Sequence, residues 1–219
     1  MKELLVLGDS HALTFEHSQR FKKKFCKYSW DSLIVVGATI SGLQNPNSKT
    51  QAMPLFIDKL GDKKRDTILI LLGEVDLGFI VWFRAQKYNE DVNVIFDDVV
   101  LKYQEFINYV KRYCDNLIVI SAPLPTIPDD RKEGEVAQLR ASIKATQEER
   151  THLTVKFNLL MQKWVIKSGY SYLNLDEACL GDNGLVINDL LNSEKADHHY
   201  DKKKYTDLLL TELENYLDH

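Results

Sequence analysis

The sequence predicts an α/β protein of three layers, with helices on both sides of a mostly parallel five-stranded sheet. Short runs rich in Val, Ile and Leu recur along the chain with little alternation of apolar and polar residues. Such runs are typical of strands buried on both faces of a parallel sheet. Longer stretches with apolar residues three or four positions apart separate these runs, and this alternation favours right-handed βαβ units.

Each predicted element can be placed on the sequence. The predicted strands are residues 3–8, 32–37, 66–73, 116–123 and 170–176. The predicted helical stretches are residues 10–25, 96–114, 135–168 and 202–217. In the second of these helices, Val99, Tyr103, Phe106 and Val110 follow one another at helical spacing, and Gly169 is a plausible C-cap of the third.

Composition limits the classes of function. The 219 residues, 44% hydrophobic and 27% charged, predict one domain spanning 1–219. The net charge of -4 gives no electrostatic reason to expect nucleic acid as a partner, and no apolar stretch is long enough to span a membrane. Three widely spaced cysteines without a Cys-X-X-Cys pattern indicate a reducing compartment, so we expect a cytoplasmic protein without cofactor or metal.

Candidate functional residues follow the predicted strands. Open parallel sheets bind ligands beyond the carboxyl ends of their strands, and Gly-Asp-Ser-His (8–11) follows the first strand directly. A serine nucleophile needs a base within hydrogen-bond reach. Of the six histidines, His17, His152 and His219 lie in predicted helices or at the C-terminus. The remaining candidates are His11, His198 and His199.

Four segments, taken in order, resemble the sequence blocks of the SGNH (GDSL-like) hydrolase superfamily. They are LGDSH (7–11), GATISGL (37–43), LLGEVD (71–76) and DHHYDKKKYTDLLLTEL (197–213). Together they extend over nearly the whole chain. The resemblance implies a flavodoxin-like fold and a serine hydrolase that forms an acyl-serine intermediate.

The resemblance also implies roles for individual residues. Ser10 matches the nucleophile, and His199, with Tyr205 six positions on, fits the position of the base better than His198 does. The backbone amides of Ser10 and Gly42 match the donors of an oxyanion hole. Asp9 is interpreted as a carboxylate that fixes the loop.

The third block departs from the family pattern Gly-X-Asn-Asp, because Val75 replaces the asparagine that donates to the oxyanion. Either two donors suffice or Asn45, Asn47 or Arg84 supplies the third. The variant Gly-Glu-Val-Asp also indicates that Glu74 and Asp76 belong to a different site architecture, although Asp76 could equally cap the next helix.

The last block departs as well, because Ala196 stands three residues before His199, where the family has its aspartate. Asp197, two residues before His199, is the candidate third member of the triad. A short loop can turn Asp197 toward the imidazole; otherwise a backbone carbonyl orients the ring.

We expect the substrate to be an acyl ester, such as an O-acetyl group, of a carbohydrate or small metabolite. Thioester hydrolysis or acyl transfer by the same serine is the first alternative, and a non-catalytic binding module is the second. Asp9-X-His11 is also how a metallophosphoesterase begins, but the chain has no Asn-His pair. Trp82, if exposed over the site, could stack on a sugar ring, and segment 123–150 is long enough for a lid or a homo-oligomer contact.

Overall fold

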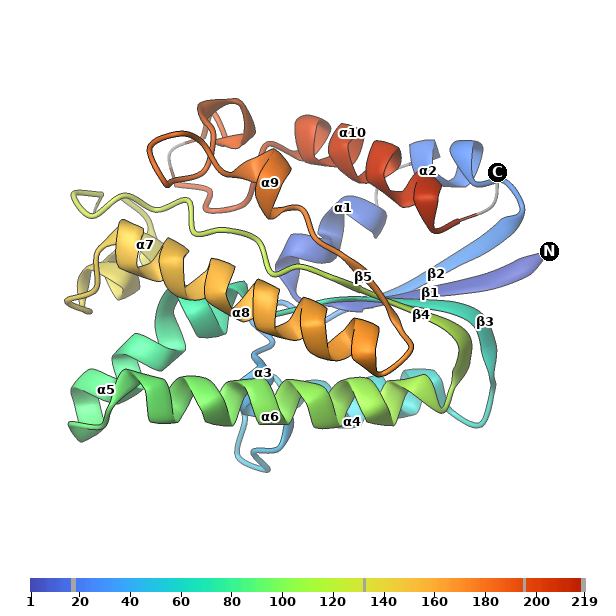
Figure 1. Cartoon of the computed structure of the whole chain (residues 1–219), viewed down its shortest axis with the longest axis horizontal. Helices are drawn as coiled ribbons and strands as arrows, with labels where there is room; N and C mark the ends of the chain where they lie inside the picture. Colours follow the sequence, from blue (N-terminus) through green and yellow to red (C-terminus); the bar gives the residue numbers. More distant parts are fainter. Residues whose placement is uncertain (17–18, 132, 195, 218–219) are drawn as a thin grey trace.

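The computed structural model describes residues 1–16, 19–131, 133–194 and 196–217, in which five parallel strands form one sheet (Figure 1). The strands are β1 (Lys2–Gly8), β2 (Tyr28–Ile34), β3 (Arg65–Leu71), β4 (Cys114–Ile120) and β5 (Ser171–Leu173). Their order across the sheet is β2-β1-β3-β4-β5, and each neighbouring pair is parallel. The predicted fold class is confirmed.

Helices cover both faces of the sheet, as the two outer layers of Figure 1 show. One layer contains α1 (Leu13–Glu16), α2 (Gln19–Lys24), α9 (Asp176–Cys179) and α10 (Lys202–Glu212). The other contains α3 (Ile40–Leu43), α4 (Ala52–Leu60), α5 (Val81–Tyr88), α6 (Val92–Lys111) and α8 (Gln147–Lys167). Along the chain, α7 (Glu135–Ala141) follows β4 and precedes α8. The shorter turns are 3-10 helices at Ser10–Ala12, Asn188–Leu190 and Leu213–Asn215 and a π-helix at Asp76–Ile80.

The central strands divide their apolar side chains between the two cores. In β1, Leu4 and Val6 face the layer of α10, while Leu5 and Leu7 face the layer of α6, and all four are at most 1% exposed. Burial of such a side chain contributes about 1.5–3 kcal/mol. Because both faces are covered, the strand carries an unbroken apolar run.

The second strand is β2 at residues 28–34, so the predicted range 32–37 was wrong at both ends. β2 is an edge strand that pairs only with β1, from Lys2 opposite Tyr28 to Gly8 opposite Ile34. An edge strand needs fewer apolar residues than a central one. The apolar run in the sequence therefore did not coincide with the residues of β2. The chain turns away after Ile34 and leaves Val36 66% exposed.

One predicted helix is interrupted, because the stretch 135–168 forms α7 and α8. Thr146 ends the gap between them by capping α8: its hydroxyl accepts from the Glu149 N–H at 3.1 Å and the Glu149 carboxylate accepts from the Thr146 N–H at 2.8 Å. The described part of the predicted helix 10–25 begins with a 3-10 turn and continues in α1 and α2. His17 and His219 lie outside the described residues.

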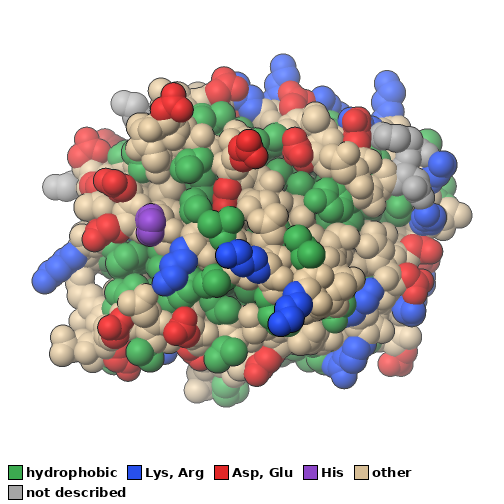
Figure 2. Space-filling view, viewed as in Figure 1, with side chains coloured by type: hydrophobic (Ala, Val, Ile, Leu, Met, Phe, Trp, Pro, Cys, Tyr) green, Lys and Arg blue, Asp and Glu red, His purple; other side chains and the backbone are tan. Residues whose placement is uncertain are grey.

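The carboxyl ends of β1, β3 and β4 lie at one edge of the sheet, because Gly8 pairs with Leu71 and Leu71 with Ile120. The loops that follow these strands therefore meet at this edge. Acidic and basic side chains are interspersed over the face drawn in Figure 2. Within the described part of the chain, no helix has the length and apolar character needed to cross a membrane.

Candidate active site

A tight turn at the end of β1 presents Ser10. A Cβ atom on Gly8 would lie 2.5 Å from the Ala12 Cβ and 2.7 Å from the Leu71 carbonyl oxygen, so only glycine lets the turn close here. Asp9 then caps the 3-10 turn by accepting from the His11 N–H at 2.9 Å. This is the loop-fixing contact expected of Asp9.

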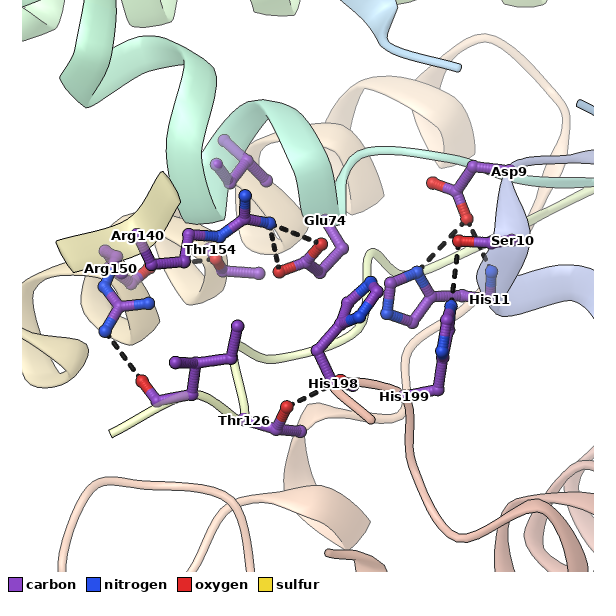
Figure 3. Close-up of polar contacts among 12 residues, drawn as sticks. Asp9, Ser10, His11, Glu74, Thr126, Arg140, Arg150, Thr154, His198 and His199 are labelled. Carbon is purple, nitrogen blue, oxygen red and sulfur yellow. Dashed lines mark hydrogen bonds and ion pairs between the residues drawn. The ribbon is translucent and has the colours of Figure 1, made fainter. Parts of the chain in front are cut away.

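Ser10, His199 and Asp197 form a continuous row of hydrogen bonds (Figure 3 shows the first two residues). The Ser10 Oγ and His199 Nε2 atoms are 2.8 Å apart, and His199 Nδ1 lies 2.6 Å from Asp197 Oδ1. Asp197 Oδ1 also accepts from the His199 backbone N–H at 2.9 Å. The loop thus turns Asp197 toward the imidazole even though it stands only two residues before the histidine.

The electrostatic surroundings keep His199 neutral and Asp197 ionised. Burial lowers the pKa of His199, with a further lowering from the charge of His11, and these effects outweigh the opposing effect of Asp197. Burial tends to raise the pKa of Asp197, but hydrogen bonds from the backbone and ring of His199 outweigh it and lower this pKa. A neutral imidazole beside a serine hydroxyl can accept the hydroxyl proton.

We predict that the reactivity of Ser10 rises with pH and is half-maximal below pH 6.5, the ordinary pKa of histidine. Protonated His199 cannot accept the serine proton, so its lowered pKa sets the acid limb. In Asp197→Asn the midpoint should move further down, because the carboxylate that raises the His199 pKa is gone. The rate of fluorophosphonate labelling as a function of pH measures both midpoints. An upward shift in the variant would contradict this assignment.

His11 and His198 lie beside His199. The ring centroids of His198 and His199 are 4.0 Å apart, and those of His11 and His199 are 4.6 Å apart. Burial lowers the pKa of His198 to about 4. Burial also works to lower the pKa of His11, but the hydrogen bond and charge of Asp9 raise it overall. The sequence had left His11 without a role, although it lies one residue from Ser10.

Glu74 forms a buried ion pair with Arg140 of α7, at 3.1 and 3.2 Å from the two carboxylate oxygens (Figure 3). Their side chains are 4% and 5% exposed. Burial would raise the pKa of Glu74, but the charge of Arg140, with smaller effects of His11 and His198, lowers it to about 2. Sequence reasoning missed Arg140, because no motif marks its position.

Asp76 holds the start of α3 rather than capping the helix that follows it. Its carboxylate accepts from the backbone N–H groups of Ile40 and Ser41, at 2.6 and 2.9 Å, and from the Ser41 hydroxyl at 2.6 Å. Burial raises the pKa of Asp76 to about 6 against these hydrogen bonds. The third block thereby fixes the position of the second block relative to β3.

The two expected oxyanion donors differ in their surroundings. The Ser10 N–H has no acceptor among the described residues. The Gly42 N–H donates to Thr39 Oγ1 at 2.9 Å and to the Thr39 carbonyl oxygen at 3.1 Å, because Thr39 is the N-cap of α3. Val75 is half-buried and its side chain has no group that can donate. The donor role of Gly42 therefore requires exchange of both Thr39 acceptors for the oxyanion.

Four other candidates contact residues other than Ser10, His199 and Asp197. Asn45 and Asn47 are exposed and contact each other, the Asn45 side chain accepting from the Asn47 N–H at 2.9 Å. Arg84 pairs with Asp98 of α6 at 3.4 Å. The Trp82 indole N–H donates to the Leu77 carbonyl oxygen at 2.8 Å, and the ring lines a surface groove next to α8. None of the four lines the cavity that contains Ser10.

A cavity of about 190 Å³ lies next to the Ser10–His199 pair. The residues that line it are Ser10, His11, Leu13, Thr14, Asn192, Asp197, His199, Tyr200, Lys202 and Tyr205. The two tyrosines are buried, whereas Asn192 is partly exposed and Lys202 is exposed. The cavity therefore has both polar and apolar side chains in its lining, next to the serine oxygen.

Segment 123–150, which was expected to form a lid or a homo-oligomer contact, forms ion pairs and hydrogen bonds within its own chain. Besides the Arg140–Glu74 pair, Arg150 of α8 donates to the Ile127 carbonyl oxygen at 2.8 Å and pairs with Asp129 at 3.2 Å.

No protein-family model matches this sequence, and no curated protein matches it. Several solved structures do match it in fold. A GDSL-like lipase from Bacteroides thetaiotaomicron superimposes with a TM-score of 0.61 at 12% identity over 98% of this chain and 86% of its own. A carbohydrate acetylesterase family member from Sinorhizobium meliloti gives 0.61 at 12% identity over 98% and 96%. A member of the lipolytic G-D-S-L family from Veillonella parvula gives 0.59 at 12% identity over 98% and 97%. The fold of this chain is the fold of these proteins.

Proposed function

We propose that this chain, which has the fold of the SGNH (GDSL-like) hydrolases, is a serine esterase that hydrolyses a small acyl ester. The row of hydrogen bonds from Ser10 through His199 to Asp197 carries the proposal. It provides a nucleophile, a neutral base at hydrogen-bond distance and a carboxylate that fixes the tautomer of the base.

In the proposed reaction, Ser10 Oγ attacks the ester carbonyl while His199 Nε2 takes its proton. The imidazolium then returns this proton to the departing alkoxide, which leaves an acyl-serine. A water molecule that loses its proton to His199 attacks the acyl group, and Ser10 recovers its proton as the acid leaves. Asp197 accepts from His199 Nδ1–H throughout and stabilises the imidazolium.

We infer that the Ser10 N–H donates to the oxyanion and that Gly42 N–H joins it. Each preorganised donor is worth about 2.7–4 kcal/mol of transition-state stabilisation. With Val75 in the third block, the side-chain donor of the family pattern is absent, so the backbone amides would carry this stabilisation.

The cavity supports a small acyl group as substrate. Its volume of about 190 Å³ lies below the roughly 300–1,000 Å³ of pockets for drug-sized ligands. We propose an O-acetyl or similar ester of a carbohydrate or small metabolite. Parallel assays with acetylated sugars and with acyl-thioesters separate this substrate class from a thioesterase.

A fluorophosphonate probe tests the proposed function, because it bonds covalently to an activated serine. We predict one labelled residue, Ser10, and complete loss of labelling in Ser10→Ala. Ser142→Ala, which removes an exposed hydroxyl at the end of α7, is the matched control and should label as the wild type does. A folded wild-type protein that does not react would contradict the esterase proposal and favour the alternative of a non-catalytic binding module.

A further inference from the structure

The site contains two Asp-X-His turns of the same construction, residues 9–11 and 197–199. In each, the aspartate Oδ1 accepts from the backbone N–H of the histidine at 2.9 Å. The same oxygen contacts Nδ1 of that histidine, at 3.3 Å in the first turn and 2.6 Å in the second. A serine triad uses one such pair, and the Asp9–His11 pair is left over.

A third imidazole, that of His198, lies against the other two (Figure 3). Its centroid is 4.0 Å from that of His199 and 5.5 Å from that of His11. One ring nitrogen from each of the three histidines lies within 4.8 Å of the others. No hydrogen bond joins the His198 ring to any described residue.

This arrangement suits a metal ion. Transition metals such as zinc bind neutral imidazole nitrogens, and three histidines with an open fourth position form one of their common sites. A carboxylate on the other ring nitrogen typically orients such a ligand. Asp9 and Asp197 hold Nδ1 of His11 and His199 in this way, so Nε2 is the ligand atom of each ring. Nε2 of His199 would exchange its hydrogen bond with Ser10 Oγ for the metal.

The local charge also favours a cation. The carboxylates of Asp9, Asp197 and Glu74 surround the imidazoles, with Arg140 as the nearby cation.

We propose that His11, His198 and His199 bind one divalent transition-metal ion of the zinc class, and that this ion inhibits Ser10 reversibly. The lone pair of His199 Nε2 that accepts the Ser10 proton would be bonded to the metal, so no base remains. The inhibition rests on the proposed esterase function, whereas the binding does not.

Titration with Co²⁺, followed by its visible absorption, tests the binding. We predict one equivalent bound in tetrahedral-type coordination by the wild type, and a Kd at least about tenfold higher in His198→Gln. His152→Gln, which changes an exposed histidine on α8, is the matched control and should bind as the wild type does. Absence of one-equivalent binding by the wild type, or equal weakening in both variants, would overturn the site.

A second measurement needs no variant. Zn²⁺ should protect His198 and His199 of the wild type, which are partly exposed, from modification by diethylpyrocarbonate while the exposed His152 continues to react. Reaction of His198 and His199 that Zn²⁺ does not change would also overturn the site.

Fluorophosphonate labelling tests the inhibition. Zn²⁺ should slow labelling of Ser10, a chelator should restore it, and His198→Gln should need at least about tenfold more Zn²⁺ for the same slowing. Labelling that Zn²⁺ does not slow would refute inhibition. If Ser10 fails to label without Zn²⁺, the esterase proposal fails, and the Co²⁺ titration still decides the metal site.

Discussion

Replacing Ser10 with alanine is expected to lower ester hydrolysis roughly a millionfold, as loss of the nucleophile does in other triad enzymes. The alanine variant keeps the cavity but has no oxygen to form the acyl intermediate. Hydrolysis of p-nitrophenyl acetate by purified wild type and variant measures this effect. A residual rate within tenfold of the wild type would show that another group performs the reaction.

A double variant sharpens this test. Because Ser10 and His199 would act as one unit, Ser10→Ala combined with His199→Ala should be no slower than Ser10→Ala alone. His152→Ala is the control for loss of an imidazole and should keep the wild-type rate. Additive losses from Ser10 and His199 would contradict a shared mechanism.

Replacing Arg140 with methionine is expected to lower the free energy of unfolding by about 3–5 kcal/mol, because it leaves the Glu74 carboxylate buried without a partner. Urea denaturation at neutral pH measures the loss. The double variant Arg140→Met, Glu74→Gln removes the stranded charge and should recover most of it.

Arg84→Met is the matched control for Arg140→Met. Arg84 also pairs with a carboxylate, that of Asp98, but these side chains are 32% and 39% exposed. Solvent screens such a pair, so its loss should cost less than about 1 kcal/mol. Equal destabilisation by the two arginine substitutions would show that burial of the Glu74 pair has no special weight.

The sequence allowed the layers of the fold to be predicted because burial on both faces leaves a clear pattern. β1, β3 and β4 carry continuous apolar runs, and their positions were close to those predicted. β2 left a weaker pattern, because its limits depend on its register with β1. The break between α7 and α8 had a local signal in Thr146 and Glu149, which form a capping box.

Contacts within the candidate site were predictable where residues close together in the sequence make them. The spacing of Asp197 and His199 allowed their contact, and the Thr39-X-X-Gly42 spacing could have revealed that a cap occupies the Gly42 amide. The position of Arg140 could not be predicted in this way. Glu74 needs a buried cation, but tertiary packing alone selects which of the chain's arginines and lysines supplies it.

The hydrogen bond between Ser10 and His199 joins residues 189 positions apart in the chain. During synthesis the ribosome adds Ser10 long before His199, which follows all five strands of the sheet along the chain. If His199 is the base, as we propose, a chain that stops before residue 199 carries the hydroxyl without it. We therefore expect a fragment left by interrupted translation or early proteolysis not to hydrolyse esters.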